Sequence, residues 1–420
     1  MLPAPSGPAV NDGGLTAAAF ARAMRSDQPA FFLDPGIEGS GRWGECGTDP
    51  SVWFSISGRR ASLREGADSR TESWEDAWSG MGRWIESRRA RGETVAGFLG
   101  FEFGNPGAGA TSKPDAALAA YPVVRDVDAE PETSRANRPS IPLLEPLSDP
   151  ELFRTGVRRT KELIASGALY QLNLSHPFRI RGISDSAAFY ADLRRRNPVA
   201  YGARLIFPGF EILSASPECL VSVRGRTVET RPIKGTRPRG RTPEEDAVLA
   251  RELVDSAKDN AELTMIVDLA RNDLGRVCEP GSVAVVSRAT LLTIPTVHHL
   301  EGTVRGTLRD GVRLGELLRA VFPGGSVTGC PKPAALQWIR ELEGADRGPY
   351  CGAIGIFRPD GSIELSVAIR TAVWDSATGD LSLRSGAGIT ALSDPDAEYD
   401  EVLEKASAFA RTVRSDISAR

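Results

Sequence analysis

Lysine is scarce in this 420-residue sequence, since six of its 51 basic residues are lysines and the rest are arginines. A bias toward arginine explains the scarcity. It also implies that a remaining lysine stands where arginine cannot substitute, because the two differ in hydration and in how readily they lose a proton. The six are Lys113, Lys161, Lys234, Lys258, Lys332 and Lys405.

Cysteine and histidine are also few. The five cysteines are widely spaced and include no C-x-x-C pair, so the sequence indicates neither a disulfide framework nor a zinc knuckle, and a reducing cytoplasm is expected. The three histidines, His176, His298 and His299, lack the H-E-x-x-H spacing of a zinc site, and no G-x-S-x-G element supports a serine hydrolase. The His298–His299 pair lies in a predicted strand, where one ring could act as acid, base or donor.

The sequence has no long hydrophobic run and no strong net charge. No stretch approaches the roughly 18 apolar residues of a membrane span, and no signal peptide is recognisable at the start. A formal charge of -4 gives no electrostatic basis for binding nucleic acid or an anionic membrane. We therefore expect no partner of either kind, and an anionic ligand must be bound by local groups.

The composition of the chain and its proline- and glycine-rich breaks predict the domain organisation. The length suits two to three domains or one large unit. We expect an N-terminal region over residues 1–126 that packs on the catalytic core, with 1–12 disordered. A Pro-rich linker should follow over 127–150, and then a catalytic domain over 151–415. Mixed strand and helix signals predict an α+β fold class.

Two predicted helices carry carboxylates on apolar faces. One is capped by Thr242-Pro243-Glu244-Glu245, restarts near Asp259 and runs to about Asn272, with Glu262 on the face of Met265 and Ile266. The other opens at Ser393-Asp394-Pro395 and carries Glu398, Glu401 and Lys405 on one face. A buried carboxylate needs a cation or donors, which a divalent metal can supply. On helix spacing alone, an internal salt bridge or a solvated stripe is the simpler interpretation.

Alternating residues on both sides of Arg224-Gly225-Arg226 predict a β-hairpin. Its two ends should bring Glu218 and Lys234 together. Lys234 could then act as a neutral amine, with burial beside Arg231, Arg237 or Arg239 lowering its pKa, or it could form a structural ion pair with Glu218. The spacing leaves both interpretations open.

Two glycine-rich loops are present, FPGGSVTGCPK (322–332) and SGAGIT (385–390). The first departs from a P-loop because Cys330-Pro331-Lys332 follows its last glycine, which disfavours an ATPase. Both loops can present backbone N–H groups to a carboxylate, or can be simple tight turns. The Arg194–Arg196 run is most simply a solvated helix end.

Taken in order, nine blocks of residues resemble the chorismate-utilising enzymes, the family of anthranilate synthase and aminodeoxychorismate synthase component I and of isochorismate and salicylate synthases. They include YQLNLS, SASPE, TRPIKGTRPRG, MIVDLARNDLGRV, HHLEGTV, FPGGSVTGCPK, RGPYCGAIG, AIRTA, and GAGIT with AEYDE. The resemblance covers residues 150 to 412. It implies two interleaved α/β halves around facing, largely antiparallel sheets, with helices outside.

The resemblance also implies the cofactor and the substrate contacts. Mg²⁺ would be held by Glu262 and Glu401, with Asp259 and Glu398 contributing through water, and would bind the ring carboxylate of chorismate. The other, enolpyruvyl carboxylate would be held by one arginine, one tyrosine and backbone amides, with further polar positions around the ring. The implied substrate-binding residues are Arg370, Tyr350, Gly386, Gly388, Thr328, Thr236 and Lys405.

Two positions indicate which member of the family this chain resembles. Gln171 stands where water-adding members carry a lysine base, which favours amination. Lys234 stands in the block Pro232-Ile233-Lys234-Gly235-Thr236, a form typical of aminodeoxychorismate synthases, where anthranilate synthases have alanine. The implied mechanism has Lys234 attacking C2 of chorismate, Glu218 as general acid at C4, and ammonia then displacing the lysine, while His299 orients or donates to the ring region.

The resemblance implies partners as well. Ammonia would come from a separate glutamine amidotransferase subunit, and a downstream lyase would convert the product to p-aminobenzoate. The sequence before the linker reads AFFLDPG where feedback-regulated relatives carry an L-E-S element, so tryptophan inhibition is not expected. Alternatives are another chorismate enzyme or a catalytically silent binding paralogue. A silent paralogue should have lost Glu262, Glu401, Glu218 or Lys234, and all four are present.

Overall fold

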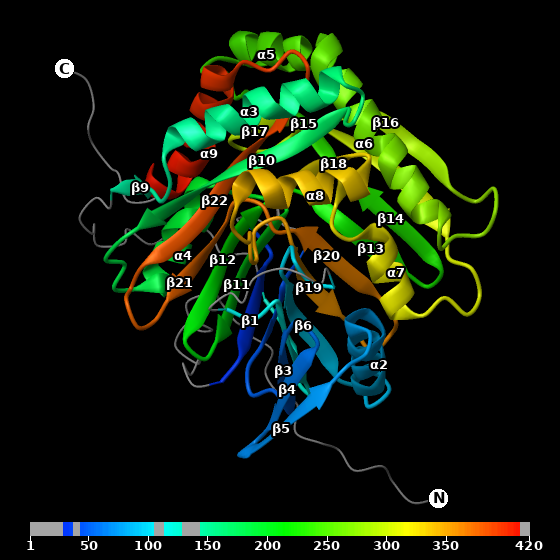
Figure 1. Ribbon diagram of the computed structural model, residues 1–420. Helices are drawn as coiled ribbons and strands as arrows, with labels where there is room; N and C mark the ends of the chain where they lie inside the picture. The colour runs from blue at the N-terminus through cyan, green and yellow to red at the C-terminus, as the bar shows by residue number, and fades with distance from the viewer. Residues whose placement is uncertain (1–27, 37–42, 105–112, 128–142, 412–420) are drawn as a thin grey trace, which may run out of the picture.

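Two large sheets form the centre of the molecule in the computed structural model, which describes residues 28–36, 43–104, 113–127 and 143–411 (Figure 1). Neighbouring strands run antiparallel. This confirms the α+β prediction. The expected disordered residues 1–12 and most of the expected linker, 128–142, lie outside the described residues.

Within the described residues, the first sheet has ten strands. Their order is β18 (Gly329–Cys330), β10 (Gln171–Ile180), β22 (Leu381–Ile389), β21 (Thr371–Asp375), β12 (Phe210–Ser216), β11 (Tyr201–Phe207), β1 (Ala30–Asp34), β2 (Glu45–Gly47) and β8 (Arg125–Asp126), with β9 (Leu144–Pro146) on β10.

Twelve strands of the described part of the chain form the second sheet. Their order is β15 (Ile233–Pro238), β17 (Val297–Thr307), β14 (Thr227–Arg231), β13 (Cys219–Arg224), β20 (Ile363–Val367), β19 (Ala353–Phe357), β6 (Thr94–Leu99), β7 (Ala116–Tyr121), β3 (Val52–Ser57), β4 (Arg60–Glu65) and β5 (Asp68–Ser73), with β16 (Ala284–Thr293) on β17.

The helices pack against these sheets (Figure 1). Three of them, α3, α8 and α9, contact β10, while α5 and α6 contact β15 and β17. Within the described ranges, no helix is both long and apolar enough to cross a membrane. The helices are α2 (Ala77–Arg89), α3 (Pro150–Ala165), α4 (Ser186–Arg196), α5 (Pro243–Asp255), α6 (Ala257–Gly275), α7 (Leu314–Val321), α8 (Lys332–Glu343) and α9 (Pro395–Arg411), with a 3₁₀ turn, η2, at Gly325–Val327.

Apolar side chains from both sheets meet in one cluster. Phe31 of β1 and Ala203 of β11 belong to the same buried group as Ala96 of β6 and Ile354 of β19. Side chains of two facing sheets interdigitate in this way when the sheets pack face to face. Because β1 pairs with β11 and β6 pairs with β19, the segment before residue 127 contributes strands to both sheets.

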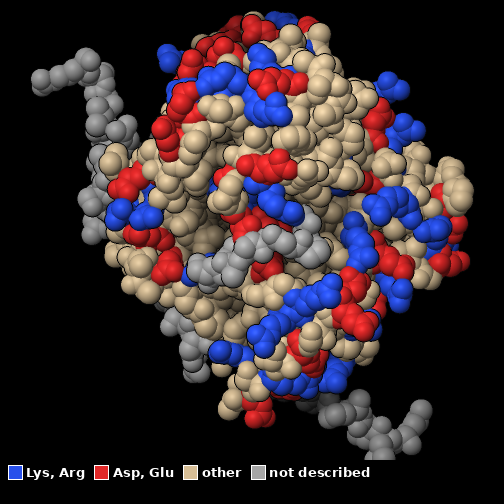
Figure 2. All heavy atoms as spheres, viewed as in Figure 1, with Lys and Arg blue, Asp and Glu red and all other residues tan. Residues whose placement is uncertain are grey.

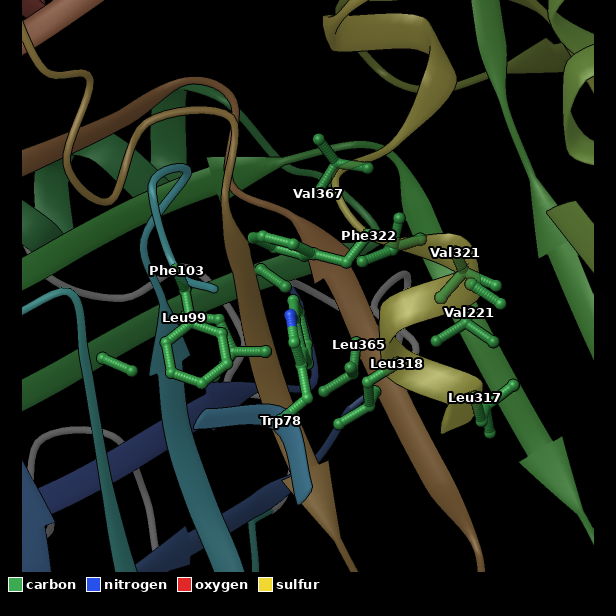
Figure 3. Close-up of a cluster of buried hydrophobic side chains, with 14 of the residues drawn as sticks. Trp78, Leu99, Phe103, Val221, Leu317, Leu318, Val321, Phe322, Leu365 and Val367 are labelled. Carbon is green, nitrogen blue, oxygen red and sulfur yellow. The ribbon is translucent and has the colours of Figure 1, made fainter. Parts of the chain in front are cut away.

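A second core lies beneath α2 and α7. Trp78 packs edge-on against Phe103, with ring centroids 4.7 Å apart, and against Phe322 at 5.4 Å (Figure 3). Leu318 and Val321 of α7 complete the cluster beside these rings. Phe322 opens the first glycine-rich loop, so this core anchors the start of that loop.

Local capping explains the two helices that precede β16. Thr242 Oγ1 accepts from the backbone N–H of Glu245, as the sequence predicts. The second helix, α6, is a separate helix capped by Ser256, whose Oγ accepts from the N–H of Asp259. It therefore begins at Ala257 and runs to Gly275, so the predicted start at Asp259 and end at Asn272 are wrong by a few residues.

The interpretation of Arg194 as part of a solvated helix end is wrong. Its guanidinium donates two hydrogen bonds of 2.7 Å to the carboxylate of Asp34, whose side chain is 3% exposed. The last turn of α4 lies beside β1, where the buried Asp34 requires a cation. The Arg194–Asp34 pair thus ties the helix to the N-terminal strand.

Replacing Arg194 with methionine should lower the free energy of unfolding by about 3 kcal/mol or more, because Asp34 would stay buried without its cation. Chemical denaturation measures this loss. The control Arg196→Met, at a side chain that is 35% exposed, should cost less than about 1 kcal/mol. The double variant Asp34→Leu/Arg194→Met should regain most of the loss, and a double variant as unstable as the single one would contradict the interpretation.

Candidate functional site

The predicted hairpin brings the acid and the amine together. Strands β13 and β14 pair antiparallel up to Arg224 and Thr227, so the chain returns from the turn toward Glu218. Ser326 joins the two groups, because its hydroxyl donates to the Glu218 carboxylate and its carbonyl accepts from Lys234 Nζ at 3.2 Å. Across the described chain, no carboxylate lies within 4 Å of Lys234 Nζ, which disfavours the structural ion pair.

Burial shifts the pKa values of this pair in opposite directions. Glu218 is 3% exposed, and burial raises the pKa of its carboxyl to about 7, although the Ser326 hydroxyl and Lys234 oppose the rise. Burial lowers the pKa of Lys234, while Glu262 and Glu218 oppose that shift. The acid is thus held near the pKa needed to donate a proton at neutral pH, and the amine moves toward its neutral form.

The arginines expected beside Lys234 are engaged elsewhere. Arg237 donates to Asp259 at 3.1 Å, Arg239 to Asp246 at 2.7 Å, and Arg231 to Tyr201 Oη at 2.9 Å. Burial, rather than these cations, is therefore the main cause of the lowered pKa of Lys234.

Glycines of β22 open space above Lys234. A Cβ atom on Gly388 would lie 2.6 Å from Gln171 Nε2 and 3.5 Å from Lys234 Nζ. A Cβ atom on Gly386 would lie 2.7 Å from the Leu174 carbonyl oxygen and 2.9 Å from Tyr350 Oη, so a larger residue does not fit at Gly386. Gln171 is 1% exposed, and its Oε1 has no partner in the described residues. A buried acceptor of this kind indicates a ligand that donates to it.

His299 presents an unpaired ring nitrogen. Its Nδ1 lies 3.1 Å from the Gly235 carbonyl and 3.0 Å from Thr236 Oγ1, while Nε2 has no partner among the residues described. Burial, with Arg370 nearby, lowers the pKa of His299 to about 4. The ring is neutral at pH 7, and Nδ1 carries the proton because a carbonyl only accepts. In this tautomer His299 Nε2 is an acceptor, and the predicted role of His299 in orienting or donating to the ring region stays a prediction.

His298 forms contacts that link neighbouring elements of the fold. Its Nε2 lies 3.0 Å from Asp246, and its Nδ1 lies 2.9 Å from Thr293 Oγ1. These contacts join α5 to β16 and β17.

Arg370 is a cation without a protein counter-charge in the described residues, since no carboxylate lies within 4 Å of it. It has a positive φ of 48° directly before β21, and burial lowers its pKa. Lys405 donates to the Gly386 carbonyl at 3.1 Å and to Glu401 at 2.6 Å. A half-buried arginine without a carboxylate partner is suited to a carboxylate ligand.

Thr328 braces the glycine loop. Its side chain is fully buried and donates to the Gly324 carbonyl at 2.9 Å, so its hydroxyl is already satisfied by the protein. Its own carbonyl accepts from the N–H of Asn173 at 2.7 Å. These contacts tie the loop to β10.

The predicted metal carboxylates come from α6 and α9. Burial raises the pKa of Glu262 and of Glu398, with Glu401 adding like charge to both. Asp259 is held by Arg237, and Glu401 is held by Lys405. Throughout the described ranges, no three His, Cys, Asp or Glu side chains are already arranged around one point as a metal site.

An oxygen-seeking cation still fits these residues. Mg²⁺ is commonly held by one or two carboxylates together with waters and substrate oxygens, rather than by a closed protein cage. Glu262 and Glu398 bring two carboxylates to this place, and burial raises the pKa of both. The donor set is therefore suited to a hard divalent cation that is completed by a ligand.

Two elements of the site were missed by sequence reasoning. Ser326 lies in the first glycine-rich loop. The sequence indicated a role for the backbone N–H groups of this loop but none for the Ser326 hydroxyl. Behind the loop, Glu343 is fully buried and pairs with Arg347 at 2.6 Å and Arg384 at 2.8 Å. Arg347 also donates to the carbonyls of Val327 and Asn173. No sequence spacing indicates this network, because its members meet only through the fold.

The family model described as chorismate binding enzyme matches residues 47–411. The chain belongs to this chorismate-binding family. It is 43% identical over 270 residues to anthranilate synthase component 1 1 of Haloarcula marismortui, a match that covers 64% of this chain and 55% of that protein. It is 40% identical over 305 residues to aminodeoxychorismate synthase component 1 of Bacillus subtilis, covering 70% and 61%.

The chain thus spans somewhat more than half the length of these curated relatives. Among solved structures, anthranilate synthase component I from Streptococcus pneumoniae matches with a TM-score of 0.76 and 25% identity, covering 97% of this chain and 100% of that one. This match confirms the predicted compound fold. Relatives of both names are similar to the chain to nearly the same degree, so the family is shown and the reaction is not.

Glu218→Gln should remove a pH dependence of stability. Because the pKa of Glu218 rises from 4.5 to about 7 on folding, the unfolded chain loses this proton first, and stability falls as pH rises through that window. The glutamine variant cannot ionise. Its free energy of unfolding relative to wild type should therefore rise by about 3 kcal/mol between pH 4.5 and pH 8. Denaturant titrations at both pH values measure the change, and an unchanged difference would refute the raised pKa.

Proposed function

We propose that this protein aminates chorismate at C4 with ammonia, forming 4-amino-4-deoxychorismate. The observation that carries the proposal is the Glu218–Ser326–Lys234 arrangement. A buried carboxyl with a pKa of about 7 and an amine without a carboxylate partner are held by one residue. A general acid and a nucleophile are the two groups that this substitution requires.

The choice among family reactions rests on two residues. Lys234 occupies the position where, by resemblance to the chorismate-utilising family, a lysine is associated with para amination. Gln171, where water-adding relatives carry a lysine, is an amide that cannot act as a base. Both side chains lie against Gly388, so they face the same space.

The substrate is a dianion, and the site offers local partners for it. Arg370, Tyr350 and the amides of Gly386 and Gly388 would hold the enolpyruvyl carboxylate. Glu262 and Glu401, with Glu398 and Asp259 beside them, would hold Mg²⁺. When bound, the ion would neutralise the ring carboxylate and stabilise charge that develops along the diene.

In the first displacement, neutral Lys234 forms a bond from Nζ to C2 of chorismate. The diene electrons shift, the C4–O bond breaks, and the hydroxyl leaves as water with the proton of Glu218. Lys234 can begin this step because the Ser326 carbonyl orients its amine without fixing a positive charge on it. His299 Nε2 and Gln171 Oε1 are free to accept hydrogen bonds from the ring region.

In the second displacement, ammonia forms the bond to C4. The electrons shift back, the C2–N bond breaks, and its electron pair returns to Lys234 as a neutral amine. The product leaves with an ammonium group at C4, which can return a proton to Glu218. A separate glutamine amidotransferase subunit would supply the ammonia, and a lyase would act on the product.

Product identity tests the proposal. Purified protein with chorismate, Mg²⁺ and an ammonium salt, followed by 4-amino-4-deoxychorismate lyase, should yield p-aminobenzoate. Anthranilate formed without the lyase would instead assign the ortho amination. This reaction is the second candidate because the chain is similar to a protein named anthranilate synthase. Isochorismate or salicylate would assign water addition.

Lys234→Ala should lower the amination rate by at least about a hundredfold, because the covalent route through C2 is lost. Chorismate should still bind, since Arg370 and the glycine amides remain, and calorimetric titration would show this. The control Lys113→Ala removes a lysine that pairs with Asp375 at 2.7 Å and should retain wild-type rates. Product formation by Lys234→Ala at the wild-type rate would remove lysine from the mechanism.

Glu262→Gln should weaken Mg²⁺ binding by about tenfold or more, since it removes one charged ligand. Calorimetry with Mg²⁺ in the presence of chorismate measures this without depending on turnover. The control Glu404→Gln changes an exposed carboxylate on α9 and should bind Mg²⁺ like the wild type. Equal affinities for wild type and Glu262→Gln would place the ion elsewhere.

A further inference from the structure

Asn173 is a buried polar residue of β10 that the proposed mechanism does not use. It is 7% exposed, and its amide Nδ2 has no hydrogen-bond partner in the described residues. A buried donor without a partner costs free energy, so its presence in a native structure indicates a group that binds to it. The neighbours of Asn173 indicate which group this is.

The backbone of Asn173 is already held by the protein. Its N–H donates to the Thr328 carbonyl at 2.7 Å, and its carbonyl accepts from Arg347 Nη2 at 2.7 Å. Arg347 is itself paired at 2.6 Å with Glu343, whose side chain is fully buried. The main-chain groups of Asn173 therefore have protein partners, and the side-chain amide is the part that is left for a ligand.

Strand pairing places the Asn173 side chain on the substrate face of the first sheet. Asn173 lies opposite Gly388 of β22, and residues directly opposite each other on antiparallel strands direct their side chains to the same face. A Cβ atom on Gly388 would lie 3.5 Å from Lys234 Nζ and 2.6 Å from Gln171 Nε2. Asn173 thus shares this face with the proposed nucleophile and with Gln171, two residues earlier on β10.

The next pair of residues along these strands belongs to the proposed carboxylate contacts. Ser175 lies opposite Gly386, and a Cβ atom on Gly386 would lie 2.9 Å from Tyr350 Oη. Asn173 therefore stands between Gln171 on one side and Tyr350 with Gly386 on the other. The χ2 torsion of asparagine is broad, so the amide can turn its two N–H bonds toward a ligand on this face.

The outer surface does not supply a substitute for such a donor. Basic and acidic side chains of the described residues are interspersed on the face shown in Figure 2. A ligand with two negative charges must then be recognised by donors within the site, and a hydrogen bond to a carboxylate is stronger than one to a neutral acceptor.

We propose that Asn173 is a further substrate-binding residue, whose Nδ2 donates a hydrogen bond to the enolpyruvyl carboxylate of chorismate. The inference rests on the proposed function for the identity of the substrate, and it adds one contact to that site. The enolpyruvyl carboxylate is the group concerned because Tyr350 and the amides of Gly386 and Gly388, which flank Asn173, are its other proposed donors.

Two substitutions at Asn173 and two ligands test this contact by calorimetric titration with Mg²⁺ and without ammonium. Asn173→Leu removes the amide at nearly constant size and should raise the Kd for chorismate by about tenfold or more. Asn173→Asp places a negative charge beside the carboxylate and should raise the Kd at least as much. The second ligand is the chorismate analogue in which a hydroxyl replaces the enolpyruvyl ether. Both variants should bind it within about twofold of the wild-type Kd.

The matched control is Asn272→Leu, the same substitution at an exposed position of α6, which should bind both ligands like the wild type. A purely structural role of Asn173 would weaken both ligands together, and binding of the analogue identifies a variant that has kept its fold. Equal losses for the two ligands, or a wild-type chorismate Kd for Asn173→Leu, would overturn the contact. If the wild type binds chorismate but forms no 4-amino product, the proposed amination fails, and the affinities still decide the role of Asn173. If the wild type does not bind chorismate, both proposals fail.

Discussion

The candidate site depends on Ser326, which forms hydrogen bonds with both Glu218 and Lys234. The hydroxyl of Ser326 favours the ionised carboxylate, while burial favours the protonated acid, and burial is the larger effect. The carbonyl of the same residue accepts from the amine without adding a negative charge that would keep it protonated. A short 3₁₀ turn therefore sets the geometry of the Glu218 carboxyl and the Lys234 amine together.

These two hydrogen bonds require that the first glycine-rich loop is rigid. Packing against the hydrophobic core keeps it rigid. Phe322, at the start of the loop, packs against Trp78 in the cluster beneath α2 and α7. Thr328 and Lys332 fix the rest of the loop through the Gly324 and Pro323 carbonyls. Arg347 donates to the Val327 carbonyl, and its charge is balanced by Glu343, whose side chain is fully buried. The loop is thus held by packing, by backbone acceptors and by a buried ion pair.

Sequence reasoning found what is encoded locally and missed what forms only between distant segments. The hairpin at Arg224-Gly225-Arg226 and the Thr242 cap follow from neighbouring residues, and both are confirmed. Resemblance predicted the compound fold, which the structural match confirms. Arg194 was misjudged because its partner Asp34 lies 160 positions earlier, and no spacing rule joins a helix end to that strand. The tautomer of His299 likewise depends on the Gly235 carbonyl, which the sequence does not place.

The scarcity of lysine acquires a physical meaning at the site. Lys332 and Lys405 face carboxylates at 2.7 and 2.6 Å, and arginine could carry the same charge at such positions. Lys234 instead bonds to a neutral carbonyl in a buried setting that lowers its pKa. Arginine would remain protonated there and could not form the bond to C2 that we propose. Of these three lysines, only Lys234 stands where the proposed amination requires the loss of a proton.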